Sequence, residues 1–139
     1  VWYPDSRGYV HFEGTYPEID LVASLKVALH LAEVGRLDPR TLGWLSEHLL
    51  NDGALYARYH IAQGQPTSGE ESLVGYALTA RIARITGKEE LYRKATDRLQ
   101  WHLATSLTSQ VRDAIFRQSP EGIVQMTAED NIWALLAFS

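Results

Sequence analysis

Apolar residues recur along most of this chain at the three- and four-residue spacing that gives a helix one buried face. The segment that starts near Lys88 is typical, because Leu91, Ala95 and Leu99 fall on one side of a helix. Gly residues, or an Asn-Asp-Gly sequence, end several of these runs, as expected at helix ends. The pattern predicts five helices, at about residues 16–34, 39–51, 69–86, 89–106 and 128–138.

The connecting segments lack this period. Residues 1–14 combine aromatic side chains with Pro and Gly, which is typical of extended chain or a loose hairpin. Residues 54–67 are predicted to form a long, partly extended loop, and residues 123–126 a short strand. The expected secondary structure is therefore helical, with irregular connections.

The first, third and fifth predicted helices open with the same local signal. In each, a hydroxyl side chain is followed three residues later by a carboxylate, which is the pattern of a capping box. The three openings are Thr15-x-x-Glu18, Ser68-x-x-Glu71 and Thr127-x-x-Asp130. They recur at intervals of roughly 50–60 residues with two helices per interval, which indicates stacked α-hairpins. The predicted fold is all-α, with antiparallel α-hairpin repeats in a single domain over residues 1–139, the odd-numbered helices inside and the even-numbered helices outside.

Composition excludes several kinds of function. The net charge is −4 and the basic residues are scattered, which argues against nucleic acid as a partner. No apolar run approaches the roughly 20 residues of a membrane-spanning helix, so no membrane partner is expected. The chain has no Cys, and its five His residues lack the spacing of metal ligands. We therefore predict neither a metal site nor a cofactor.

Acidic residues gather in the first turns of the odd-numbered helices. If the inner helices run in the same direction, these residues meet at one rim of the fold: Glu18, Asp20, Glu70, Glu71, Glu129 and Asp130. Such a rim suits glycoside hydrolysis, in which one carboxylic acid protonates the leaving oxygen and another carboxylate activates water or stabilises positive charge. The alternative is structural, because a carboxylate in a first helical turn favours the macrodipole and completes the cap.

These two interpretations divide the acidic candidates. The capping-box position accounts structurally for Glu18, Glu71 and Asp130. Asp20 lies two residues beyond the box and needs no capping role, so it is the candidate catalytic residue. Glu70, like Glu129, stands one residue before the box position and is a candidate for contact with a substrate.

Aromatic side chains fall into two groups. Those on loops could stack on the apolar faces of sugar rings, and they are Trp2, Tyr3, Tyr56 and Tyr59. Those within predicted helices are expected to be packing residues, and they are Trp44, Trp101 and Trp133. The predicted substrate-binding residues are Glu18, Glu70, Glu129, Tyr56 and Tyr59.

Three stretches resemble a known family. Residues 71–92 resemble the third-quarter hairpin of six-hairpin glycosidases, above all glycoside hydrolase family 8 and related exopolysaccharide hydrolases, in the pattern ES-x-x-x-YAL-x-AR-x-A-x-x-TG-x-x-ELY. Residues 129–138 are similar to the FDN-x-x-ALLAL helix of that family, and residues 18–29 to its acidic-x-Asp inner helix. The resemblance implies part of an (α/α)6 toroid, an oligo- or polysaccharide ligand, no cofactor, and a secreted or otherwise extracytoplasmic location. It also implies that Asp20 lies in the sugar cleft.

Two departures from the family limit what the resemblance implies. The general-acid Glu of the family, found in a Glu-x-x-Gly-Tyr context, has no counterpart in this sequence. A complete toroid has six hairpins, whereas five helices are predicted here. The chain therefore resembles a C-terminal portion, expected to be inactive alone and to pair with another chain or a second copy that completes the helical array.

Two other functions stay open. A non-catalytic helical-repeat module could bind a peptide or partner surface in its concave face, and the short length agrees with that function. A lyase or epimerase on the same toroid would favour Tyr and His over paired carboxylates.

Overall fold

The structure is a computed structural model that describes residues 2–3, 8–9, 18–105, 110–119 and 121–139. Most of these residues are helical. In chain order the elements are β1 (Trp2–Tyr3), β2 (Gly8–Tyr9), β3 (Glu18–Asp20), α1 (Leu21–Glu33), α2 (Pro39–Ser46), the π-helix η1 (Glu47–Asp52), β4 (Arg58–His60), α3 (Leu73–Ile85), α4 (Glu89–Trp101), β5 (Arg117–Gln118), β6 (Val124–Gln125) and α5 (Ala128–Phe138). The described strands pair antiparallel in three ribbons, β1 with β2, β3 with β4 and β5 with β6. No helix in the described ranges is long and apolar enough to cross a membrane.

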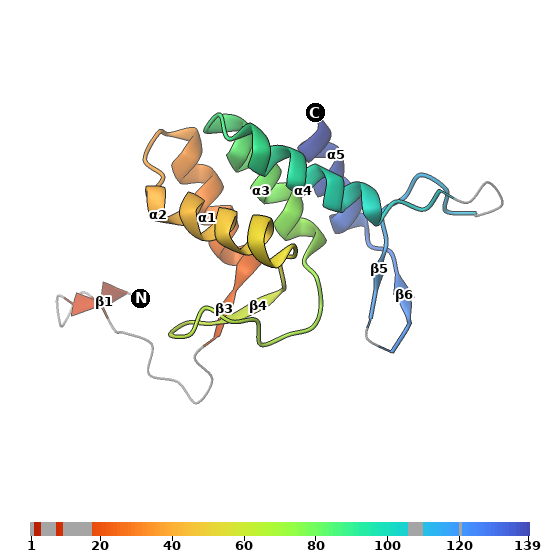
Figure 1. Cartoon of the computed structure of the whole chain (residues 1–139), viewed down its shortest axis with the longest axis horizontal. Helices are drawn as coiled ribbons and strands as arrows, with labels where there is room; N and C mark the ends of the chain where they lie inside the picture. The colour runs from red at the N-terminus through yellow and green to blue at the C-terminus, as the bar shows by residue number, and fades with distance from the viewer. Residues whose placement is uncertain (1, 4–7, 10–17, 106–109, 120) are drawn as a thin grey trace.

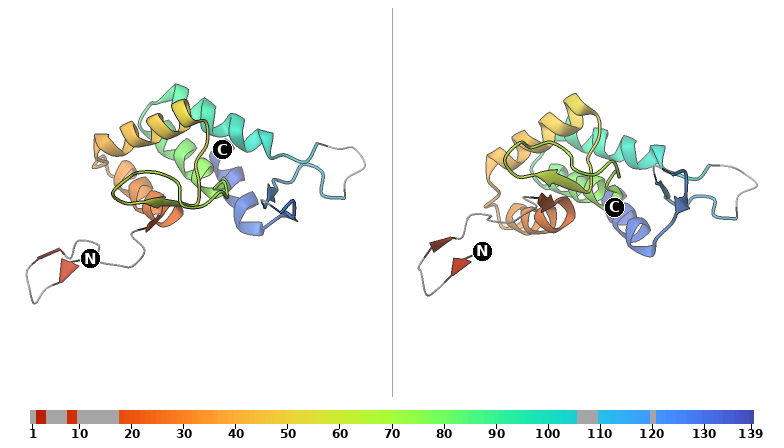
Figure 2. Two further views of the ribbon diagram at one scale, coloured as in Figure 1. Left: turned by 60° about the horizontal axis from the view of Figure 1, so that its bottom comes forward. Right: turned by 90° about the horizontal axis from the view of Figure 1, so that it is seen from below.

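The helices form two layers. In Figure 1, α1, α3 and α5 lie side by side and run in the same direction, with α3 in the middle, and α3 packs against both neighbours. The segment formed by α2 and η1, together with α4, makes the second layer, and Figure 2 shows the same arrangement from two other sides. The prediction that the third and fourth helices pack together is confirmed, because α3 and α4 share an extensive contact.

Helix α3 is the centre of the core. Ten of its 13 residues are buried, and Tyr76, Leu78 and Ile82 are fully enclosed. A Cβ atom added at Gly75 would lie 3.0 Å from Cδ2 of Leu21, so the absence of a side chain there allows α1 to approach the start of α3 closely. The starts of these two helices are thereby held together, which matters for the cavity described below.

Three helices, α2, α4 and α5, begin where the sequence pattern predicts. The side chain of Asp38 caps α2, with Pro39 in the first turn, where its missing N–H costs no hydrogen bond. Thr127 caps α5 by accepting a hydrogen bond from the backbone N–H of Asp130. The strand predicted at residues 123–126 is confirmed as β6.

The predicted start of the first helix is wrong. Residues 18–20 form β3, which pairs with β4 at residues 58–60, and α1 begins only at Leu21. Asp20 is the N-cap of this helix, while Thr15, the predicted cap, lies outside the described residues. The backbone of residues 18–20 pairs with residues 58–60, about 40 positions further along the chain, and local sequence signals do not encode this pairing.

The third and fourth helices also differ from prediction at one end. The cap of α3 is Ser72, whose Oγ accepts from the N–H of Gly75 at 3.0 Å, whereas Ser68 accepts from the N–H of Glu70 before the helix starts. Helix α4 stops at Trp101 instead of near residue 106, because the chain from residue 103 pairs in extended form with residues 114–115.

Candidate functional site

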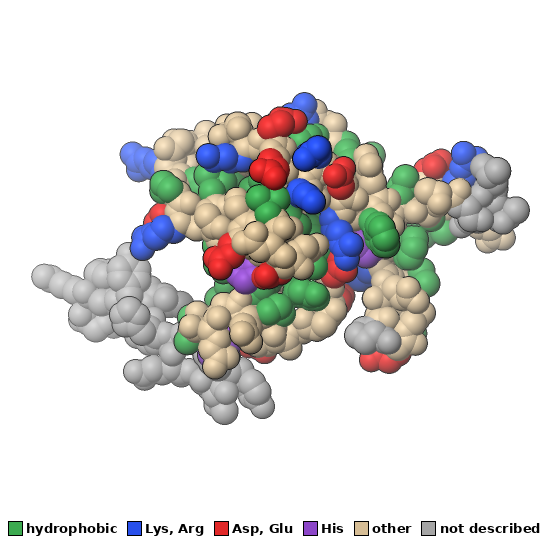
Figure 3. Space-filling model, viewed as in Figure 1, with side chains coloured by type: hydrophobic (Ala, Val, Ile, Leu, Met, Phe, Trp, Pro, Cys, Tyr) green, Lys and Arg blue, Asp and Glu red, His purple; other side chains and the backbone are tan. Residues whose placement is uncertain are grey.

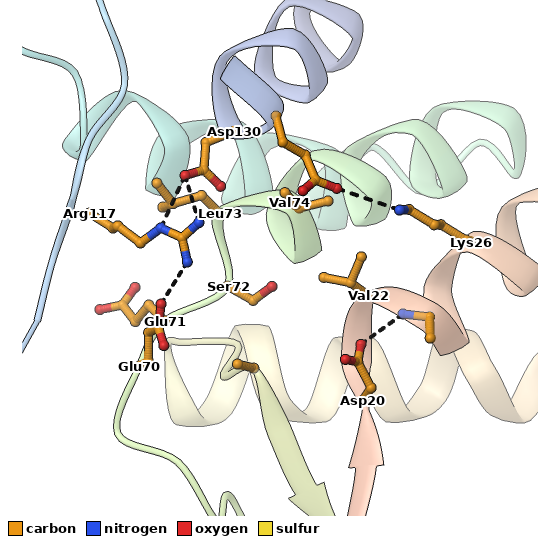
Figure 4. Close-up of a pocket in the computed structure, with 13 residues that line it drawn as sticks. Asp20, Val22, Lys26, Glu70, Glu71, Ser72, Leu73, Val74, Arg117 and Asp130 are labelled. Carbon is orange, nitrogen blue, oxygen red and sulfur yellow. Dashed lines mark hydrogen bonds and ion pairs between the residues drawn. The ribbon is translucent and has the colours of Figure 1, made fainter. Parts of the chain in front are cut away.

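A cavity of about 410 Å³ opens where α1, α3 and α5 begin. Because the three helices run in the same direction, their first turns converge there. Figure 4 shows the charged side chains around its walls and Ser72, Val22 and Val74 between them. Its acidic lining residues are Asp20, Glu70, Glu71, Glu129 and Asp130, and its basic ones are Lys26 and Arg117. Two other hollows, of about 570 and 690 Å³, have mainly apolar walls and do not bring charges together in this way.

Asp20 serves α1 and faces the cavity at the same time. Its Oδ1 accepts a hydrogen bond from the backbone N–H of Ala23 at 2.9 Å, so the prediction that Asp20 has no capping role is wrong. The side chain is nevertheless exposed to the cavity (Figure 4). Across the described part of the chain, no group hydrogen-bonds to the second oxygen, Oδ2, and no cation pairs with this carboxylate.

Arg117 joins two walls of the cavity. It comes from β5 and donates hydrogen bonds to Oε1 of Glu70 at 2.6 Å and, from Nε, to Oδ2 of Asp130 at 3.1 Å. Its Nη2 lies 3.0 Å from the same Oδ2 as an ion pair. Burial by itself lowers the pKa of Arg117, but the hydrogen bond with Glu70 and the charges of both carboxylates raise it overall. Asp130 is 2% exposed and also accepts from the hydroxyl of Thr127. Glu70 is thus held by a cation and still lines the cavity.

Glu129 lines the cavity at the start of α5 and pairs with a lysine of α1. Its carboxylate lies 3.5 Å from Nζ of Lys26, so this ion pair links α5 to α1 across the mouth of the cavity. The same ammonium group lies 5.8 Å from the ring centre of Trp133. Both charged side chains are well exposed, and the pair therefore contributes little to stability.

Glu71 lies at the back of the cavity in a partly buried network. Its carboxylate accepts from Arg98 at 2.5 and 2.9 Å and from the hydroxyl of Tyr76 at 2.5 Å, and it lies 3.5 Å from Nε2 of His102. Burial alone raises the pKa of Glu71, but the hydrogen bonds from His102, Arg98 and Tyr76 together lower it to about 2. The Tyr76 pKa is raised by burial and by its hydrogen bond to Glu71. Glu71 is therefore ionised at neutral pH and has no proton to donate.

Three predicted binding residues lie elsewhere. Glu18 pairs with Arg58 at 3.5 Å on the β3–β4 ribbon, outside the cavity lining. Tyr59 is 1% exposed and packs edge-on against Trp44, so no ligand can reach its ring, and Tyr56 is half-buried beside it. No aromatic side chain among the described residues lines the cavity.

The sequence pattern missed the basic residues of the site. Arg117 follows an irregular stretch that carries no periodic signal, and Lys26 sits within an otherwise ordinary amphipathic helix. Only Asp20, of the five lining carboxylates, lacks a cation partner among the described residues, because Lys26, Arg98 and Arg117 pair with the other four. In the described ranges no group of three His, Cys, Asp or Glu residues is arranged to hold a metal ion.

The fold can be compared with solved structures. Over 99% of its length the chain superimposes on a novel alpha-amylase from Clostridium perfringens, with a TM-score of 0.82 and 28% sequence identity. The fold is glycosidase-like. PssZ from Listeria monocytogenes matches over 92% of the chain with a TM-score of 0.66, and at 18% identity this likeness shows the fold alone.

The chain corresponds to only a part of each of these two neighbours. The chain spans 39% of the alpha-amylase chain and 37% of the PssZ chain. No protein-family model matches the sequence, and no curated protein matches it significantly.

Proposed function

We propose that this chain is the cleft-forming part of a glycoside hydrolase-like protein and that its acidic cavity binds an oligo- or polysaccharide. One observation carries the proposal: the starts of three parallel helices, together with the two residues just before the cap of α3, place five carboxylates around one open cavity, in a fold shared with an alpha-amylase. Carboxylates accept hydrogen bonds from sugar hydroxyls, and Lys26 at the rim can donate them. The finer assignment to glycoside hydrolase family 8, with its (α/α)6 toroid, follows the sequence resemblance. A polysaccharide substrate would also agree with a secreted or extracytoplasmic location.

Asp20 is the carboxylate best suited to a catalytic role. Its charge is not balanced by a cation among the described residues, and its Oδ2 is open to the cavity. Such a group can activate water or stabilise the positive charge that develops on the sugar ring. Glu70 and Glu129, each held by an ion pair, suit the positioning of hydroxyl groups.

Hydrolysis also needs a protonated carboxylic acid, and Glu71 does not supply one because its pKa is lowered to about 2. We therefore expect the chain to bind sugar but to hydrolyse it at a negligible rate. Its acid partner would come from a further segment, such as the remaining part of a longer protein or a second chain.

Replacement of Asp20 by Asn tests the proposal. Asn is as good an N-cap as Asp, so α1 stays intact while the charge is lost. Hydrogen bonds to a charged group contribute about 1.5–3 kcal/mol, and we expect Asp20→Asn to weaken the binding of a maltooligosaccharide, measured by calorimetry, by roughly 10- to 100-fold. α-Glucans are the first choice of ligand because the structural neighbour is described as an alpha-amylase.

Asp38→Asn is the matched control, because Asp38 is also an exposed N-cap and does not line the cavity. It should bind sugar like the wild type. A reducing-end assay on the same proteins should show no significant hydrolysis. Undiminished binding by Asp20→Asn would remove Asp20 from the site, and robust hydrolysis by the chain alone would contradict the need for a second segment.

A second function is favoured by a separate observation. Apolar side chains on α1 and α5 are exposed, among them Val27, Ile132 and Leu135, with exposed fractions of 61, 57 and 71%. Apolar surface of this extent is typical of an interface. We propose that these helices pack against further helices of a partner chain or a second copy, which is also what a non-catalytic interaction module would do.

A further inference from the structure

Trp101 contradicts the expectation that tryptophans within helices are packing residues. It is the last residue of α4, and 76% of its surface is exposed, the largest fraction of any large apolar side chain that the structure describes. Tryptophan usually buries a large area, and an exposed one often marks a site of recognition.

The surroundings of Trp101 form a small hollow. Helix η1 packs against α4 on the face turned to the viewer in Figure 1, which Figure 3 draws with its side chains. Between these two helices lies a depression of about 230 Å³, lined by Leu49, Leu50, Gly53, Lys94, Asp97, Arg98 and Trp101. The guanidinium carbon of Arg98 lies 5.6 Å from the centre of the Trp101 ring, which holds the ring by a cation–π contact.

The charges of the hollow indicate what it can bind. Arg98 is neutralised by its ion pair with Glu71. The remaining charged side chains, Lys94 and Asp97, are exposed and opposite in sign, and neither forms an ion pair with a residue in the described ranges. The hollow is therefore close to neutral and offers donors, an acceptor and an aromatic face. This combination suits a neutral polyhydroxylated ligand better than a phosphate or another strongly charged group.

We infer that Trp101, Lys94 and Asp97 form a second carbohydrate-binding site, at which a sugar ring stacks on the indole and its hydroxyls bond to the two charged side chains. The inference rests on the proposed function, since it assumes that the protein acts on a polysaccharide. Arg98 stands between the two sites, because it contacts Trp101 on one side and Glu71, at the back of the acidic cavity, on the other. A long polymer could engage the second site while a shorter stretch of it occupies the cavity, which would raise retention on the polymer by avidity.

The experiment compares a polymer with a short oligosaccharide. Retention on insoluble starch and calorimetric binding of maltotriose are measured for the wild type, Trp101→Ala, Trp101→Phe and Asp20→Asn. Ile123→Ala, which shortens an exposed apolar side chain that lies in neither site nor in α1 or α5, is the control. Trp101 is so exposed that its truncation should leave the fold intact, and circular dichroism checks this.

We expect Trp101→Ala to lower the apparent affinity for starch by about tenfold, as is common when an aromatic anchor is removed, and to leave maltotriose binding unchanged. Trp101→Phe should keep most of the retention and Ile123→Ala all of it. If Asp20→Asn weakens maltotriose binding while Trp101→Ala is retained on starch like the wild type, the second site is refuted and the cavity stands. If Trp101→Ala alone loses binding and Asp20→Asn has no effect, the second site stands and the cavity fails. No retention of the wild type, or self-association that depends on Trp101 without any effect on starch, would also overturn the inference.

Discussion

The ion pair between Glu71 and Arg98 should govern how the stability of this protein depends on pH. It joins the segment that precedes α3 to α4, and the two side chains are 23% and 30% exposed. Tyr76 adds a hydrogen bond from α3, and His102 approaches from the chain beyond α4. Neutralising the carboxylate by Glu71→Gln removes the charge while leaving a side chain of the same shape.

The size of the effect follows from the pKa of Glu71, which falls from 4.5 to about 2 in the folded protein. At about 1.4 kcal/mol per pKa unit, this difference corresponds to about 3 kcal/mol of stabilisation. Because the folded-state pKa lies below the unfolded-state pKa, the stabilisation is fully present above about pH 4.5 and is lost as the pH falls toward 2. About 2 kcal/mol of it should be gone at pH 3.

Urea unfolding followed by circular dichroism, from pH 7 to pH 3, measures this dependence. At pH 7, Glu71→Gln should be less stable than the wild type by about 2–3 kcal/mol, and the two unfolding free energies should converge by about 2 kcal/mol at pH 3. Glu90→Gln, an exposed carboxylate on α4, is the control and should change stability by less than about 0.5 kcal/mol. A difference between wild type and Glu71→Gln that is the same at pH 7 and pH 3 would refute the reasoning.

Two further predictions concern the core and the exposed helices. Leu78→Ala, at a fully buried position of α3, should lower the unfolding free energy by about 2–5 kcal/mol in urea titrations. Leu135→Ala, at a position that is 71% exposed, should change it by less than about 0.5 kcal/mol. Similar losses for both variants would show that α3 is not the core. Sedimentation velocity should show self-association that grows with protein concentration, because apolar side chains of α1 and α5 are exposed. A protein that stays monomeric at high concentration and does not bind a hydrophobic dye would contradict the proposed interface.

The helices could be predicted from the sequence because most of them are amphipathic and end at glycine. The stripe of Leu91, Ala95 and Leu99 is buried in α4 as expected, and the turn after α3 uses Gly87 at a φ of 69°. The errors lie at the starts of α1 and α3 and at the end of α4. Ser68 precedes a segment that is still extended, because residues 70–72 pair with residues 55–57 through backbone hydrogen bonds, and the helix starts only after Ser72.

The site could be predicted only in part. Asp20, Glu70 and Glu129 line one cavity because three parallel helices start at one edge, and a repeat of helix openings does indicate such an edge. The roles of Tyr59 and Arg117 depend on contacts far apart in the sequence. Tyr59 is turned inward by the pairing of β3 with β4, and Arg117 reaches Glu70 and Asp130 from a hairpin whose position no local pattern specifies.

The position of Asp20 shows why capping and function are not exclusive alternatives. An N-cap needs one carboxylate oxygen, and Oδ1 of Asp20 fulfils that need by accepting from Ala23. The start of a helix also favours an acidic side chain, because the positive end of the helix dipole lies there. The second oxygen therefore remains available to a ligand, whereas Glu70 and Glu129 are already bonded to Arg117 and Lys26. In the proposed function, a cap residue at the mouth of the cavity would supply the fixed negative charge that faces the positive charge developing on a sugar ring.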